Sequence, residues 1–141
     1  MSLARERLET ARVARLATVR PDGSPHLVPF VFAVEDDRVY SAVDDKPKRS
    51  PELQRLANIA REPRVCVLAD HYEEDWSGLW WVRADGRAVA LPEGDDQEER
   101  EHALDLLAER YVAYRERRPS GAVVRIDVDR WTTWPEDERA R

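Results

Sequence analysis

The segment from Pro25 to Val34 restricts the possible folds of this chain more than any other. Its sequence, PHLVPFVFAV, has the alternation of a β-strand, but both of its faces are apolar. A strand that is apolar on both faces is buried on both sides, so we expect a barrel wall whose outer side is covered by a partner subunit or by a flat ligand. Pro29 cannot donate a ladder hydrogen bond, which predicts that the strand is interrupted there or lies at a sheet edge.

Short strand patterns joined by turns make up most of the remaining chain. Val13–Val19 and the turn Pro21-Asp22-Gly23 come before this segment, and the turn Asp36-Asp37 and Val39–Val43 follow it. Further strand patterns are predicted at Arg64–Ala69, at Leu79–Ala84 and Arg87–Leu91 as a hairpin about Asp85-Gly86, and at Ala122–Trp134.

Helical patterns are predicted over residues 2–11, after Ser50-Pro51, and from Asp95 or Asp96 onward with a core stripe of Leu104, Leu107, Ala108 and Tyr111. Together the patterns predict a single domain over residues 1–141 of the mainly β (α+β) class. We expect an antiparallel barrel of six to seven strands with about three peripheral helices.

The composition excludes several classes of partner. The net charge of −6 and the pI near 5.2 argue against a general nucleic-acid binder and against a protein of anionic membranes. No apolar run has the length of a membrane span and no signal-peptide segment stands at the N-terminus, so we expect a cytoplasmic protein. The single cysteine, Cys66, excludes an intrachain disulfide, and its strand context Val65-Cys66-Val67 predicts a buried, inert thiol.

A basic loop stands out against this acidic background. Lys46, Lys48 and Arg49 fall within four residues, directly before Ser50, a suitable N-cap, and Pro51, which suits the first helical position. The positive end of a helix and these cations therefore converge, as in sites that hold a phosphate or a group of carboxylates. The alternative is a solvated basic loop.

Other nucleotide and catalytic motifs are missing from the sequence. The five glycines form neither a dinucleotide-binding fingerprint nor a P-loop, and there is no G-x-S-x-G elbow. His26, His71 and His102 lack metal-ligand spacing, so we expect no metal site. The five tryptophans either fill the core and a dimer interface, or Trp76 or Trp80 flanks a planar ring system; because Trp80 and Trp81 are adjacent on a strand, they must point to opposite faces.

The matching segments of a known family run through most of the chain. They are Val13–Val19 with Pro21–Pro29, the basic loop, Leu56-Ala57-Asn58-Ile59 with Pro63-Arg64-Val65, and Trp76–Gly86. On these residues the chain resembles the split-barrel flavin and deazaflavin oxidoreductases of the pyridoxamine-phosphate-oxidase-like superfamily. The similarity is greatest to their small actinobacterial deazaflavin-dependent branch.

The resemblance implies a split-barrel homodimer with cofactor in clefts between the subunits. It implies that the cofactor ring lies near Val28, Pro29 and Phe30, and that the basic loop and the following helix hold its phosphate. Family members often place a basic residue three positions before the asparagine, and here that residue is Arg55. The candidate cofactor-binding residues are therefore Val28, Pro29, Phe30, Lys46, Lys48, Arg49, Ser50, Arg55 and Trp76.

The expected activity is that of a coenzyme F-420 (8-hydroxy-5-deazaflavin)-dependent oxidoreductase, which transfers hydride from the reduced cofactor to a small electrophilic acceptor. The deazaflavin carries a phosphodiester and a polyglutamate tail, so a larger basic patch suits it better than FMN. An FMN-dependent enzyme of the same fold, or a non-catalytic protein that binds deazaflavin, FMN or haem, remains open. No catalytic acid or nucleophile is assigned, because the cofactor supplies the chemistry; Tyr72, His71 or water would deliver the proton.

Overall fold

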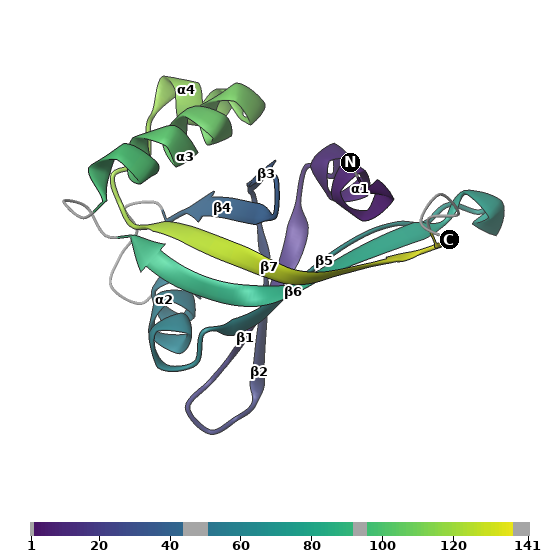
Figure 1. The fold of residues 1–141 in the computed structure, drawn as a ribbon, viewed down its shortest axis with the longest axis horizontal. Helices are drawn as coiled ribbons and strands as arrows, with labels where there is room; N and C mark the ends of the chain where they lie inside the picture. Colours follow the sequence, from purple (N-terminus) through teal and green to yellow (C-terminus); the bar gives the residue numbers. More distant parts are fainter. Residues whose placement is uncertain (1, 44–50, 92–95, 137–141) are drawn as a thin grey trace.

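The computed structural model describes residues 2–43, 51–91 and 96–136. Seven strands form one antiparallel sheet in the order β2-β1-β5-β6-β7-β4-β3 (Figure 1). Their bounds are β1 Ala14–Val19, β2 Pro25–Phe30, β3 Ala33–Glu35, β4 Arg38–Ala42, β5 Arg64–His71, β6 Trp80–Leu91 and β7 Val123–Trp134. The helices are α1 Leu3–Thr10, α2 Pro51–Arg61, α3 Gln97–Arg110 and α4 Val112–Glu116, with a 3-10 turn, η1, at Trp76–Gly78. The mainly β class and the seven strands confirm the prediction, and α4 adds a helix to the expected three.

The sheet curls into a split barrel around its two longest strands. β6 and β7 pair from Trp81 opposite Trp134 to Leu91 opposite Val123 and cross the molecule as a curved ribbon (Figure 1). The two edge strands, β2 and β3, are consecutive in the chain and are joined through Val31 and Phe32. This corner is fixed because Ser41 Oγ donates to the carbonyl of Val31 at 2.9 Å.

Helices close the open ends of the barrel. Buried side chains of α1 and α2 join strand residues in the main core: Leu8, Ile59, Leu16, Val67, Val82 and Ile126. α3 covers the other end, where Leu104 and Leu107 pack with Tyr40 in a second cluster. Ser2 caps α1 as predicted, its side chain accepting a hydrogen bond from the Arg5 N–H. Among the described helices, none is long and apolar enough to cross a membrane.

The predicted hairpin about Asp85-Gly86 is wrong. Trp80–Leu91 is one continuous strand, β6, and the ladder with β7 shifts register between Asp85 and Gly86. A Cβ on Gly86 would lie 2.3 Å from the carbonyl oxygen of Asp127. The glycine is therefore present because two backbones approach closely at a β-bulge, and not because the chain reverses direction.

The Pro25–Val34 segment is divided between two strands. β2 ends at Phe30 and β3 begins at Ala33, so the expectation of one long strand is corrected. The prediction made from Pro29 is confirmed in both of its forms, because β2 is an edge strand and it stops one residue after the proline. Because β2 has a free edge, the N–H that Pro29 lacks does not remove a hydrogen bond from a ladder.

Candidate functional site

The alternation of β2 separates the three residues that were expected to contact the cofactor ring. Phe30 is buried, with its ring centroid 5.4 Å from that of Phe32, and Val28 packs against the same core. Pro29 is exposed and lies opposite Arg15 of β1. Successive side chains of a strand point to opposite faces, so only Pro29 of the three is presented on the outer face of the sheet.

The outer face around Pro29 carries an apolar surface. The register places Pro29, Arg15, Leu68 and Arg83 in one row across four strands, and Leu27, Ala17, Cys66 and Asp85 in the next. Leu27 is 65% exposed and Leu68 is 40% exposed. We refer to Leu27, Pro29, Ala17, Cys66 and Leu68 as the outer apolar face. Exposed apolar patches are often binding surfaces for a partner or ligand, so the outer apolar face is a candidate binding surface.

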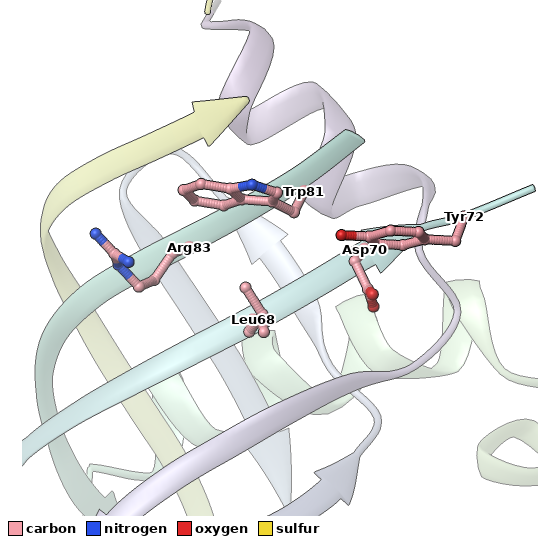
Figure 2. Close-up of a pocket in the computed structure, with 5 residues that line it drawn as sticks. All are labelled: Leu68, Asp70, Tyr72, Trp81 and Arg83. Carbon is pink, nitrogen blue, oxygen red and sulfur yellow. The ribbon is translucent and has the colours of Figure 1, made fainter. Parts of the chain in front are cut away.

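A groove adjoins the outer apolar face on β5 and β6. Its lining is Leu68, Asp70, Tyr72, Trp81 and Arg83, and its volume is about 230 Å³ (Figure 2). Arg83 lies with its guanidinium carbon 5.6 Å from the centre of the Trp81 ring, and its Nε is 3.2 Å from Asp85 Oδ2. The groove thus combines two aromatic rings with one carboxylate and one guanidinium, a lining that suits a flat polar ring system.

The predicted phosphate-binding residues are seen in part. Lys46, Lys48, Arg49 and Ser50 lie outside the described residues, while α2 begins at Pro51 as expected. Arg55, on the second turn of α2, is only 5% exposed. Three residues further on, the fully buried Asn58 donates from Nδ2 to Thr18 Oγ1 at 2.9 Å, and its Oδ1 accepts from Gln54 Nε2 at 2.8 Å. The Asn58–Thr18 bond holds α2 against β1, while the Gln54–Asn58 bond within α2 orients the Asn58 amide.

His26 is a candidate site residue that sequence reasoning missed. It lies opposite Thr18 in the β1–β2 ladder, is 9% exposed, and its Nδ1 has no hydrogen-bond partner within the described part of the chain. Burial lowers the pKa of His26 from its ordinary value, and the positive charges of Arg20 and Arg55 lower it further. A buried ring nitrogen beside cations suits an anionic group, which would supply the missing hydrogen bond. The available signal was a polar residue on the inward-facing side of an otherwise apolar strand.

Trp76 lies far from these residues within one chain. It is 74% exposed in η1, at the tip of the β5–β6 hairpin, and Figure 1 shows η1 at the opposite end of the molecule from α2. A cofactor contact that uses both Trp76 and Arg55 would therefore need two chains. The neighbouring tryptophans behave as predicted, since Trp80 packs against the core and Trp81 faces the groove.

The three histidines lie on separate elements. His71 Nε2 is 3.2 Å from Glu73, and His102 Nε2 is 2.8 Å from Glu35. Within residues 2–43, 51–91 and 96–136, no three His, Cys, Asp or Glu side chains gather in a group that would hold a metal ion.

Cys66 is half-buried on the outer apolar face, and we expect it to react slowly. Burial and then the neighbouring Asp85 raise the pKa of the Cys66 thiol to about 11. Only the thiolate is nucleophilic, so modification by a disulfide reagent at pH 8 should be slower than in the unfolded chain by about a hundredfold. Equal rates in the native protein and in denaturant would show that the thiol is not shielded.

Comparisons with known proteins show the family to which the chain belongs. Residues 2–135 match the family described as pyridoxamine 5′-phosphate oxidase. The chain belongs to this family. The resemblance stated from the sequence motifs is thereby confirmed at the level of the split-barrel flavin-binding proteins.

Individual relatives extend the comparison. Over 94 residues the chain is 31% identical to a 5a,11a-dehydrotetracycline/5a,11a-dehydrooxytetracycline reductase of Streptomyces rimosus; the alignment covers 66% of this chain and 64% of the reductase. A FAD-binding protein from Mesorhizobium loti has a TM-score of 0.68 at 25% identity, covering 94% of this chain and 93% of its own. A haem-binding protein from Mycobacterium smegmatis has a TM-score of 0.73 at 21% identity, covering 96% of this chain and 54% of its own, and shares the fold.

Proposed function

We propose that this protein is a coenzyme F-420-dependent oxidoreductase that reduces a small electrophilic acceptor. One observation carries the proposal: the edge strand β2 presents the shielded, cation-flanked His26 on one face and the exposed Pro29, within the outer apolar face, on the other. An edge strand with a polar anchor on one side and an apolar shelf on the other matches a cofactor that has an anionic tail and a flat ring. The named relatives, a reductase and a FAD-binding protein, support redox chemistry with a flavin-type group.

The residues present fit such a cofactor. Arg55, His26 and the basic residues before α2 would hold the phosphate, because charge-assisted hydrogen bonds to phosphate are strong where water is excluded. Leu27, Pro29 and Ala17 of the outer apolar face would support the ring and keep water away from it. When bound, the reduced cofactor supplies a hydride; this chain supplies binding, orientation and a dry surface.

FMN is the second candidate cofactor, and the FAD-binding relative supports a flavin-type group. A non-catalytic binding protein for deazaflavin, FMN or haem is the remaining alternative, and a haem-binding protein has this fold. Titration of cofactor-free protein with reduced F-420 and, in parallel, with FMN distinguishes the cofactors. Turnover with a panel of quinones, enones and tetrapyrroles then distinguishes an enzyme from a carrier; tight F-420 binding without reduction of any acceptor would favour the carrier.

We further propose a homodimer that covers the outer apolar face and completes the cofactor cleft. Leu27 is the most exposed aliphatic side chain of this face, so Leu27→Asp should place a charge in the interface and shift the protein to monomer. Val112→Asp is the matched control, since Val112 is 58% exposed on α4, a helix that packs on α3 away from this face. Light scattering at micromolar concentration measures the result, and a wild-type protein that is already monomeric contradicts the proposal.

The affinity for F-420 should rise as the pH falls from 8 to 6. In the free protein the pKa of His26 is lowered below its ordinary 6.5, first by burial and then by Arg20 and Arg55. A bound phosphodiester favours the protonated ring, so its pKa is higher in the complex and binding takes up a proton. Calorimetry in two buffers of different ionisation enthalpy measures that uptake. His26→Gln should abolish the pH dependence; an unchanged proton uptake in this variant would remove His26 from the site.

A further inference from the structure

The groove on β5 and β6 has a defined geometry. Asp70 lies opposite Trp81, and Leu68 lies opposite Arg83. The four residues therefore form a square on the sheet, with the charged residues Asp70 and Arg83 on one diagonal and the apolar residues Leu68 and Trp81 on the other. Diagonal neighbours of this kind are roughly 7–8 Å apart. Figure 2 shows Leu68 on β5 and Trp81 beside it on β6, with Arg83 toward one end of the groove and Asp70 and Tyr72 close together toward the other end. The polar ends are thus spaced for a fused ring system lying on Leu68.

The charges of the groove disfavour an anionic ligand. Arg83 is already offset by Asp85 through its Nε, while within the described residues its two terminal nitrogens contact no carboxylate. Asp70 is exposed and forms no hydrogen bond or ion pair within the described part of the chain that involves its carboxylate. The hairpin beyond the groove adds Glu73, Glu74 and Asp75. An uncharged ligand with a hydroxyl donor at one end and a carbonyl acceptor at the other fits these groups best.

We propose that this groove binds the electron acceptor, and that the acceptor is an uncharged, planar, conjugated carbonyl compound bearing a hydroxyl group. Its ring lies against Trp81 and Leu68, its hydroxyl donates to Asp70, and its carbonyl oxygen accepts a hydrogen bond from Arg83. This inference rests on the proposed function for the identity of the reductant, a reduced deazaflavin or flavin.

The position of the groove supports this role. The row Pro29–Arg15–Leu68 places the floor of the groove two strand spacings, or roughly 10 Å, from Pro29, which is about the width of the cofactor ring that the outer apolar face would carry. In the reduction, a hydride forms a C–H bond at the conjugated carbon, the π electron pair moves to the carbonyl oxygen, and water supplies the proton. Arg83 is positioned to stabilise the negative charge that arrives on that oxygen.

Binding of two matched probes tests the inference without turnover. Cofactor-free protein is dialysed to equilibrium at pH 6.5 against 7-hydroxyflavone and against flavone, which lacks the hydroxyl. We expect the wild type to prefer 7-hydroxyflavone about tenfold, because Asp70 accepts its hydroxyl. Asp70→Asn should reduce that preference to near one and leave flavone binding unchanged. Trp81→Leu should weaken both ligands on the order of tenfold through loss of the ring contact.

Asp129→Asn is the control, since Asp129 is an exposed carboxylate on β7 outside the groove, and its affinities should equal those of the wild type. Failure of the wild type to bind either probe, or equal affinities in wild type, Asp70→Asn and Trp81→Leu, overturns the inference. If Trp81→Leu does not fold, the ratio of the two probe affinities in Asp70→Asn is sufficient to test the inference. The F-420 titration is a separate readout. Probe binding without F-420 binding would contradict the proposed function but leave the groove as a ligand site. F-420 binding with no preference between the probes would contradict the assignment of the groove as the acceptor site.

Discussion

Arg49→Glu should weaken F-420 binding tenfold to a hundredfold or more, while the melting temperature of the cofactor-free protein stays near that of the wild type. One charge-assisted hydrogen bond to phosphate contributes roughly 1.5–3 kcal/mol, and the glutamate adds repulsion. Arg49 lies outside the described residues, between the end of β4 and the first residue of α2, so the prediction rests on the sequence and on the α2 start at Pro51. Titration at low and high salt measures the effect, which should be larger at low salt.

The control for this experiment changes once the fold is known. On sequence grounds Arg38 stands in a turn away from the basic loop and would serve as the matched charge reversal. In the structure Arg38 is 3.2 Å from both Glu99 and Asp127, so its reversal would also disturb the contact between α3 and the sheet. Arg117→Glu is the better control, because Arg117 is exposed at the end of α4. If Arg49→Glu and Arg117→Glu bind F-420 alike, the basic loop is only solvated; if Arg49→Glu does not fold, the role of Arg49 is structural.

The parts of the fold that follow from local chemistry were predictable from the sequence. The Ser2 cap, the helix start at Pro51 and the edge position of Pro29 each depend on a group that the residue at that position itself supplies or lacks. Alternation likewise located Ala14–Val19 and Val123–Trp134, because one face of each strand packs on the barrel core.

Long-range contacts set the parts that were not predictable. His26 becomes a candidate site residue only because β1 and α2 enclose it, and one of its two cationic neighbours, Arg55, is distant from it in the sequence. The family resemblance grouped Val28 and Phe30 with Pro29 near the cofactor ring, but the pleat turns Val28 and Phe30 to the opposite face. The distance between Trp76 and α2 depends on the length of the β5–β6 hairpin, which local pattern does not determine.

The error at Asp85-Gly86 has the same origin. Asp-Gly is a strong signal for a two-residue hairpin turn, in which the glycine takes a positive φ. Among the described glycines only Gly23 has a positive φ, and Gly86 instead lies within β6 against the backbone of β7. A hairpin turn and a β-bulge at Gly86 predict different losses of stability when a methyl group is added at this position.

Gly86→Ala should therefore destabilise the protein far more than a turn glycine would. The added Cβ would lie 2.3 Å from Asp127 O and 3.0 Å from its carbonyl carbon, and both are backbone atoms that cannot move without breaking the β6–β7 ladder. Overpacking of this kind costs about 3 kcal/mol, which for a chain of 141 residues lowers the melting temperature by about 10 °C.

Gly23→Ala is the matched comparison for Gly86→Ala. Gly23 has φ +87° in the β1–β2 turn, and nothing lies within 4 Å of an added Cβ, so its cost is conformational only, about 1–2 kcal/mol. Thermal unfolding of both variants at one protein concentration gives the change in melting temperature for each. If Asp85-Gly86 formed a hairpin turn, the two substitutions would lower the melting temperature equally. Because the added Cβ would meet the backbone of Asp127, we expect a larger fall for Gly86→Ala. Equal falls in melting temperature would contradict the bulge.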